Sequence, residues 1–433
     1  MNRIPTELPR GQAITVDLEG ESVPAFEGEP VACSLLAAGE MVFARSVKYH
    51  RPRAPFCFEG ACSHCLMRVD GVPNQYTCQT AARPGMKLER QNSYPSAKHD
   101  VFSAIDFLFP RGLDHHEMFA GVPVAEQVMA KVARHLAGLG KLPDAPAPER
   151  LPAITLQTKV AIAGGGAAGS ALAFELSSRG VSFQLFEREA YLGGRLIEGA
   201  PEPDAPGTPD LLGNQSVRLH STVIGLFDDE HGRYFAVVQL AVEPRLLKVY
   251  ADRFVIAVGG HPELLPFENN DLPGVFSGRM VSQLIRRHGL VPGRKLAVIG
   301  RGPELAPMVQ LIEKASARVA VTLDLAEGEV LKAHGRGQVT GVTIKTAGAI
   351  KKISCDGIAL VVPPSPAFEL ARQGGAKVAF DPRFGTFVVE ADGSGQTQTK
   401  DLFVAGDVAG ATSAKAAFDS GRKVADAVAR SLS

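Results

Sequence analysis

The sequence has no excess of charge of either sign and no long apolar run. Lysine and arginine together number 46, as do aspartate and glutamate, so the composition lacks the basic excess of many nucleic-acid-binding proteins. No apolar stretch approaches the roughly 18 residues that a transmembrane helix needs. Residues 1–12 also lack the apolar core of a signal peptide. We therefore expect a cytoplasmic protein without nucleic-acid partners or a transmembrane segment.

Cysteine is scarce as well, and four of the six cysteines lie in one stretch, "CFEGACSHCLMRVDGVPNQYTC". Their spacing, C-x4-C-x2-C-x12-C, matches the plant-type ferredoxin loop, which binds a 2Fe–2S cluster. The first three cysteines and the small residues between them form what we call the cysteine loop (residues 57–65). Small side chains there let backbone amides turn towards the sulfur atoms. The spacing predicts that the cluster ligands are Cys57, Cys62, Cys65 and Cys78.

Two other interpretations of these cysteines stay open at this point. A zinc site normally uses two short C-x-x-C-type pairs, whereas Cys78 stands alone. Disulfides or purely structural roles are disfavoured by the cytoplasmic location. Cys33 and Cys355 lie in apolar surroundings and are expected to be core residues. His115 and His116 have no partner at ligand spacing, so we expect structural or surface roles for them.

Secondary-structure signals divide the chain into four parts. Residues 1–95 alternate short strands with one helical stretch and fit a β-grasp domain around the cysteine loop. Residues 96–154 predict a helical connector that ends in a Pro-rich linker. Residues 155–262 together with 396–433 predict a Rossmann-like domain, which a second such domain at residues 263–395 interrupts. The predicted fold class is therefore α/β, with two dinucleotide-binding domains behind a ferredoxin-like domain.

The stretch "KVAIAGGGAAGSALAFELSSRGVSFQLFERE" predicts a dinucleotide-binding unit. It has a strand, a G-x-G-x-x-G turn, a helix and a second strand that ends at Glu187. The helix N-terminus offers N–H groups to a pyrophosphate, and the terminal acid can bind ribose hydroxyls. "YLGGR" and "DLFVAGD" match stretches that contact the cofactor in two-dinucleotide flavoproteins, where the aspartate binds the ribityl chain of FAD. The expected binding residues are Gly164, Gly166, Ala167, Ala168, Gly169, Glu187, Arg188, Gly194, Arg195, Gly406 and Asp407.

A second glycine turn, "KLAVIGRGPELAPMVQLIE", departs from the pattern. It keeps Gly300 and Gly302 but has Leu305 where the third glycine belongs, and a later strand ends at Asp324. These residues could bind NAD, with Asp324 on the ribose. The alternative is a Rossmann unit that has lost its ligand.

Several stretches, in this order, resemble a known family. They are "KYHRPR", the cysteine loop, "FPRGLDHHEMFAG", the first glycine turn, "PFENNDLPGVF" and "LFVAGD". Over nearly the whole chain, they resemble the alpha subunit of heterotetrameric sarcosine oxidase and related subunits. These relatives are subunits of proline, hydroxyproline and opine dehydrogenases and of hydrogen cyanide synthase.

The resemblance implies an electron-transfer subunit of an amine or amino-acid dehydrogenase. The amine would be oxidised at an FAD in a beta-type partner subunit, and an FMN would lie at the subunit interface. The first Rossmann site would hold FAD or NAD, and a quinone or carrier protein would accept the electrons. We predict no catalytic residue in this chain. Attachment to the inner membrane would come only through partners.

The sequence departs from sarcosine oxidase alpha subunits at two points: the first makes folate-linked formaldehyde capture unexpected, and the second favours the dehydrogenase branch of the family. Alpha subunits of sarcosine oxidase carry a folate-binding domain, whereas this sequence stops at Ser433 after the expected closing helix. Their N-terminal domain lacks a cluster, whereas all four cysteines are present here. In addition, residues 200–216 form a Pro-rich stretch where the family suggests a helix.

Two other functions are compatible with these motifs. One is a self-sufficient NADH-dependent oxidoreductase with FAD and a 2Fe–2S cluster, which Leu305 in the second glycine turn disfavours. The other is an assembly or regulatory subunit whose nucleotide is structural.

Overall fold

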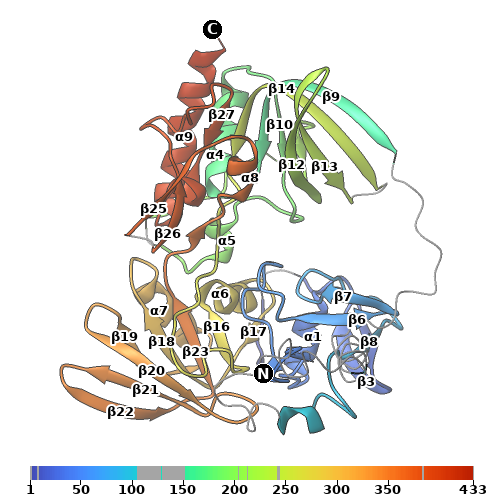
Figure 1. Cartoon of the computed structure of the whole chain (residues 1–433), viewed down its shortest axis with the longest axis vertical. Coiled ribbons are helices and arrows are strands. Elements are labelled where there is room, and N and C mark those ends of the chain that lie inside the picture. The colour runs from blue at the N-terminus through green and yellow to red at the C-terminus, as the bar shows by residue number, and fades with distance from the viewer. Residues whose placement is uncertain are drawn as a thin grey trace. The chain divides into compact units, whose positions relative to one another are not determined.

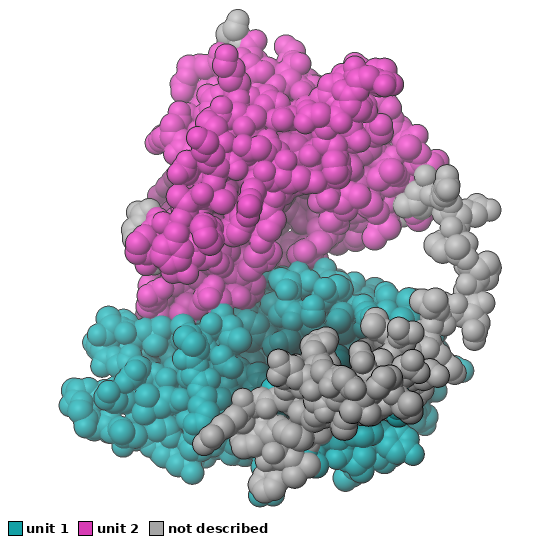
Figure 2. Space-filling view, viewed as in Figure 1, with its two compact units in different colours: residues 1–147, 264–300, 309–360 teal, residues 148–263, 301–308, 361–433 magenta. Residues whose placement is uncertain are grey.

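The computed structural model describes most of the chain, which divides into two compact units (Figure 2). The described residues are 2–6, 9–104, 128, 152–202, 204–211, 213–240, 244–382 and 385–432. Unit 1 comprises residues 1–147, 264–300 and 309–360, and unit 2 comprises residues 148–263, 301–308 and 361–433. Most of the predicted helical connector, with His115 and His116, lies outside the described residues. The four-part domain division stays a prediction.

The N-terminal part of unit 1 is a mixed five-stranded sheet with one helix (Figure 1). Its strands follow the order β3-β2-β8-β6-β7, and β2 runs parallel to β8. The elements are β2 (Ala13–Leu18), β3 (Glu21–Phe26), α1 (Val31–Ala37), β6 (Leu66–Val69), β7 (Val72–Tyr76) and β8 (Lys87–Glu89). Strands β2 and β3 form an antiparallel hairpin, and the predicted helical stretch of this part is α1. Two short strands, β4 (Ala44–Arg45) and β5 (Pro52–Arg53), precede the cysteine loop.

The rest of unit 1 is a second sheet with strand order β16-β23-β18-β19 and a three-stranded antiparallel sheet. The elements are β16 (Val275–Ser277), α6 (Gly278–Arg286), β17 (Leu290–Val291), β18 (Lys295–Gly300), α7 (Leu305–Lys314), β19 (Arg318–Asp324), β20 (Gly328–His334), β21 (Gly341–Thr346), β22 (Ala349–Ser354) and β23 (Gly357–Val361). Residues 305–308 of α7 and Val361 of β23 fall in unit 2. The N-terminal strand β1 (Asn2–Arg3) pairs with β17. The two parts of unit 1 are therefore joined by backbone pairing.

Unit 2 is built on a sheet of order β11-β10-β9-β14-β13-β12, with β27 also paired to β14. The elements are β9 (Ala153–Ala163), α4 (Ala167–Ser178), β10 (Phe183–Phe186), α5 (Arg195–Glu198), β11 (Val217–Arg218), β12 (Ser221–Asp229), β13 (Gly232–Gln239), β14 (Arg245–Ile256), β27 (Leu402–Val404) and α9 (Ala414–Ser431). Strand β9 begins six residues before Lys159, where the stretch quoted in the sequence analysis starts, because its alternating first half pairs with β14. Smaller elements are η1 (Val101–Ser103, in unit 1), β15 (Gly260–His261), β24 (Ser365–Pro366), α8 (Glu369–Gln373), β25 (Val378–Asp381), β26 (Thr386–Val389) and η2 (Gly406–Ala409).

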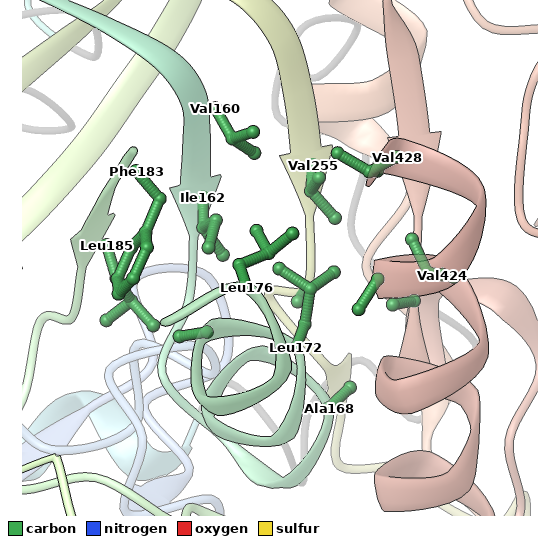
Figure 3. Close-up of a cluster of buried hydrophobic side chains, with 14 of the residues drawn as sticks. Val160, Ile162, Ala168, Leu172, Leu176, Phe183, Leu185, Val255, Val424 and Val428 are labelled. Atoms are coloured by element: carbon green, nitrogen blue, oxygen red, sulfur yellow. The ribbon is translucent and has the colours of Figure 1, made fainter. Parts of the chain in front are cut away.

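The core of unit 2 lies between the parallel strands and the helices α4 and α9 (Figure 3). Its side chains come mainly from strands β9, β10, β14 and β27 and from helices α4 and α9, as expected for a parallel sheet covered by helices. Labelled members are Val160, Ile162, Leu172, Leu176, Phe183, Leu185, Val255, Val424 and Val428. This packing fixes the start of α4, where the first glycine turn lies.

Helix α9 approaches α4 closely at Gly421, where a Cβ atom would lie 2.1 Å from the carbonyl oxygen of Ala168. We predict that Gly421→Val lowers the free energy of unfolding by about 1–3 kcal/mol, because the backbone of α4 must move to admit the side chain. Denaturant unfolding of both proteins measures this. Lys423→Ala, at an exposed position of the same helix, is the control and should stay near wild type. Equal stabilities of all three proteins would contradict the close approach.

Candidate functional site

The four predicted cluster ligands lie together in unit 1. Cys57, Cys65 and Cys78 are buried, and Cys62 is partly exposed. Their thiols interact in two hydrogen-bonded pairs, Cys57 with Cys62 and Cys65 with Cys78. Electrostatic interactions of Cys62 with Cys65 and of Cys57 with Cys78 join the pairs. One small region of the fold therefore holds all four sulfur atoms.

Within each pair, the pKa values of the two thiols are shifted in opposite directions. The hydrogen bond from its partner lowers the pKa of Cys62 to about 5, and the same bond raises the pKa of Cys57, with burial adding to the rise. In the second pair, the hydrogen bond lowers the pKa of Cys65 and raises that of Cys78. One thiol of each pair thus readily becomes the thiolate that a metal ion binds.

The backbone of the cysteine loop points amide groups at sulfur. The N–H groups of Glu59 and Ala61 each donate to Cys57 Sγ over 3.3 Å. Phe58, Gly60 and Ser63 have positive φ angles of 61°, 69° and 57°. Alternation of such residues with right-handed ones turns successive N–H groups to one side and makes an anion-binding concavity. The loop is therefore suited to hold a negatively charged cluster.

This donor set fits two iron ions better than one zinc ion. Among the described residues, no three histidine, cysteine, aspartate or glutamate side chains are arranged to hold a metal ion. Zinc in a structural site needs all four sulfurs around a single point. In a 2Fe–2S cluster each iron takes only two cysteines, and the sulfide ions complete its coordination. Two pairs of thiols with amide donors match that requirement.

The cysteine loop packs against the second part of unit 1. Phe56 and Cys57 belong to the same buried cluster as Val275 and Ile358 of the neighbouring sheet. The N–H of Ser277, at the start of α6, donates to the carbonyl oxygen of Phe56 over 3.0 Å. At the other end of α6, the His288 ring lies 5.7 Å from that of Phe58. The loop therefore lies along α6.

Three basic residues of the motif "KYHRPR" contact acidic side chains. His50 Nδ1 lies 2.7 Å from Asp100 Oδ2, and both side chains are buried. Arg51 and Arg53 each approach the carboxylate of Asp271, over 3.0 and 3.5 Å. The motif thus helps attach the residues before the cysteine loop to the second part of unit 1.

The first glycine turn forms in unit 2 as the sequence predicted. Gly164 has φ 96°, and a Cβ atom there would lie 2.4 Å from the carbonyl oxygen of Ala257. A Cβ atom on Gly169 would lie 1.9 Å from the carbonyl oxygen of Gly164. Gly166 is the N-cap of α4, and a Cβ atom added to it would meet no other residue within 4 Å. Two of the glycines therefore allow close packing, and Gly166 leaves room where a phosphate would approach the helix.

The residues after β10 lie next to this turn. Glu187 accepts hydrogen bonds from the N–H of Gly165 over 2.6 Å and of Glu189 over 2.8 Å. Burial raises the pKa of its carboxyl group, although these amides oppose the shift. Arg188 is exposed and pairs with Glu189 over 3.1 Å. Glu187 therefore lies at the glycine turn, whereas the guanidinium group of Arg188 lies beside the carboxylate of Glu189.

The predicted glycine pair lies against the same turn. The N–H of Gly193 donates to the carbonyl oxygen of Gly165 over 2.9 Å. A Cβ atom on Gly194 would lie 3.0 Å from Gly166 Cα. Gly406, with φ 80°, approaches Ala168 in the first turn of α4, where its Cβ atom would be 2.8 Å from that of Ala168. Three separate stretches of sequence therefore meet at the start of α4, where Ala167 is also buried.

Arg195 forms a buried ionic group with two acids of unit 2. Its Nη1 donates to Asp407 Oδ1 over 2.7 Å, and its Nε donates to Glu304 Oε1 over 3.1 Å. Nη2 also donates to the carbonyl oxygen of Thr412 over 3.1 Å. Burial lowers the pKa of Arg195, but Asp407 and Glu304 together raise it more. The predicted residues Arg195 and Asp407 are thus in direct contact, and Glu304 is a partner that the sequence did not indicate.

The second glycine turn directly follows strand β18. Gly300 ends β18, and its partner in the parallel register is Asp324, the last residue of β19. Asp324 Oδ1 accepts from the N–H of Ala326 over 2.9 Å. Gly302 has φ 92°. Leu305, in the place of the third glycine, is buried.

A family model described as a 2Fe-2S iron-sulfur cluster binding domain matches residues 11–93. A second, described as an NAD(P)-binding Rossmann-like domain, matches residues 162–207. The first match includes the four paired cysteines, and the second includes the first glycine turn and Glu187. The predicted combination of an iron–sulfur domain with a dinucleotide-binding domain is confirmed.

The chain is also similar to known proteins. It is 25% identical over 469 residues to sarcosine oxidase subunit alpha of Rhizobium meliloti, covering 98% of this chain and 46% of that one. It is 38% identical over 80 residues to hydrogen cyanide synthase subunit HcnA of Pseudomonas aeruginosa, covering 18% of this chain and 76% of that one. The chain therefore spans less than half the length of the sarcosine oxidase subunits it matches.

Among solved structures, L-proline dehydrogenase from P. horikoshii matches 99% of this chain and 75% of its own with a TM-score of 0.71 and 22% identity. This likeness concerns the fold, and it confirms the predicted fold class. Within the described residues, no helix combines the length and the hydropathy needed to cross a membrane.

We predict that Arg195→Met lowers the free energy of unfolding by about 3–5 kcal/mol, because it leaves the buried Asp407 and the largely buried Glu304 without their cation. Arg188→Met, at an exposed position nearby, is the control and should cost less than about 1 kcal/mol. Denaturant unfolding of the three proteins measures both values. Equal effects at the two positions would contradict a stabilising role for the ionic group.

His288 gives a pH dependence whose sign follows from its environment. Burial, with Arg287 nearby, lowers the pKa of His288 to about 4, so it is neutral in the folded protein and binds a proton on unfolding below about pH 6.5. Its contribution to stability is therefore complete above that pH and is lost as the pH falls towards 4. Between pH 7 and 5, the wild type should lose about 2 kcal/mol more than His288→Gln. Denaturant unfolding at both pH values measures this, and an unchanged pH dependence in His288→Gln would refute it. The exposed His231, changed to Gln, is the control.

Proposed function

We propose that this chain, which belongs to the family of sarcosine oxidase alpha subunits and hydrogen cyanide synthase subunits, is the electron-transfer subunit of a multi-subunit amine or amino-acid dehydrogenase. The observation that carries the proposal is the presence, in one chain, of two thiol pairs suited to two irons and a dinucleotide turn. The family consists of oxidoreductase subunits, which supports the reaction class.

The partner in this proposal is a beta-type subunit that contains FAD and oxidises the amine. Electrons would pass to an FMN at the subunit interface and then to this chain, and a quinone or carrier protein would accept them. A bound 2Fe–2S cluster supplies one-electron transfer. The chain's own contribution is to hold the sulfur atoms, to donate amides to Cys57 and to exclude water from three of the four cysteines.

We propose FAD for the first Rossmann site. The open space beside Gly166 would admit the pyrophosphate at the start of α4, and Glu187 would meet the ribose of the adenosine. Asp407 would reach the ribityl chain, with Arg195 fixing the orientation of its carboxylate. NAD is the alternative occupant. For the second glycine turn, the buried Leu305 supports a structural role rather than NAD binding.

The test starts with the purified chain under anaerobic conditions. Iron and sulfide analysis should give about two of each per chain, and dithionite should produce the EPR signal of a reduced 2Fe–2S centre. Cys57→Ser should abolish the signal, because the first thiol pair is lost. Cys355→Ser is the matched control, since Cys355 is a buried cysteine with no thiol partner in the described structure. Iron-free protein, or a signal unaffected by Cys57→Ser, would refute the cluster assignment.

The relay is then tested in a complex reconstituted with a beta-type subunit. Sarcosine, proline, hydroxyproline and an opine serve as candidate donors, and a quinone dye as acceptor. Amine-dependent reduction of the dye should depend on an intact Cys57. If NADH alone reduces the cluster in the isolated chain, the self-sufficient NADH oxidoreductase is the correct function instead.

A further inference from the structure

Helix α6 contacts the cysteine loop through one charged pair. Arg279, the second residue of α6, brings its Nη1 to within 3.6 Å of Glu59 Oε1. The side chains of Arg279 and Glu59 are only 13% and 15% exposed. Charges that are shielded from water act on their surroundings more strongly than exposed ones. This pair is therefore able to influence a neighbouring redox centre.

Glu59 is connected to the sulfur atoms by its own backbone. Its N–H donates to Cys57 Sγ, in one of two such bonds to that atom. The preceding residues are held by the same helix, since Ser277 of the α6 N-cap bonds to Phe56. Movement of the Glu59 side chain would shift an amide that stabilises thiolate charge. The pair thus acts on the sulfur site both by charge and by position.

We propose that Arg279 is a positioning residue that, with Glu59, sets the reduction potential of the cluster held by Cys57, Cys62, Cys65 and Cys78. This inference rests on the cluster assignment in the proposed function. One-electron reduction, by a flavin in the complex or by dithionite in the experiment, adds one negative charge to the site. The cation of Arg279 favours that added charge, and the anion of Glu59 opposes it.

The two members of the pair therefore have opposite effects on the potential. Arg279→Met removes the cation and leaves the acid, so the potential should fall. Glu59→Gln removes the negative charge while it keeps the backbone amide, so the potential should rise. Arg279→Lys keeps the charge and should lie closer to wild type than Arg279→Met. If the substitutions merely loosened the loop, the shifts in reduction potential would not have opposite signs in Arg279→Met and Glu59→Gln.

The measurement is an anaerobic spectroelectrochemical titration of the full chain, with iron content determined for each protein. At the wild-type midpoint, each single neutralising change should alter the ratio of oxidised to reduced cluster about ten-fold, which is about 59 mV for a one-electron couple. Lys345→Met, which removes a cation from an exposed pair with Glu329 elsewhere in unit 1, is the control and should leave the potential unchanged.

The outcomes separate this inference from the proposed function. A wild-type chain without iron overturns both. Iron-loaded variants that keep the wild-type potential, or that shift in the same direction, overturn the role of the pair and leave the cluster assignment in place. If Arg279→Met does not load iron, Glu59→Gln and Arg279→Lys decide the question, since the predicted rise in Glu59→Gln does not depend on the loss of the arginine.

Discussion

Holding four cysteine sulfur atoms together, three in the cysteine loop and the fourth at Cys78, is the constraint on which much of unit 1 depends. Thiolates repel one another and lose hydration when they are buried, so the loop must supply compensating donors. The amides of Glu59 and Ala61 do this for Cys57, and the positive φ angles of Phe58 and Ser63 make the required backbone path possible. These angles cost energy in residues other than glycine, and the packing around the loop must offset that cost.

The packing that offsets it comes from the second part of unit 1. Phe56 and Cys57 share a buried cluster with the sheet that contains β16 and β23, and Phe58 contacts His288. The pairing of the N-terminal strand β1 with β17 also connects the two parts of unit 1. The Rossmann-like part of unit 1 thus has a structural task. It packs against the cysteine loop, whether or not it binds a nucleotide.

The sequence predicted the local features of the sites but not their long-range partners. The spacing of the cysteines and the order of strand, glycine turn and helix are short-range signals, because each depends on residues close along the chain. Glu304 lies 109 residues from Arg195, and Asp407 lies 212 residues from it. No local pattern connects such positions. The early start of β9 was missed for a related reason, since its first half is stabilised by pairing with β14. The packing of Phe56 against the neighbouring sheet likewise depends on tertiary structure alone.

Several buried or partly buried cations near the proposed sites are matched by acids of the same unit. Arg195 is matched by Asp407 and Glu304, Arg51 and Arg53 by Asp271, and Arg279 by Glu59. A buried charge without a partner is destabilising, so a matched pair is the form in which a cation can be kept near a redox centre. Because such a pair has no net charge, its electric field depends on how the cation and the anion are oriented. The cysteine loop therefore experiences charges whose effect is determined by the geometry of α6, and under our proposal the same contacts serve both folding and the reduction potential.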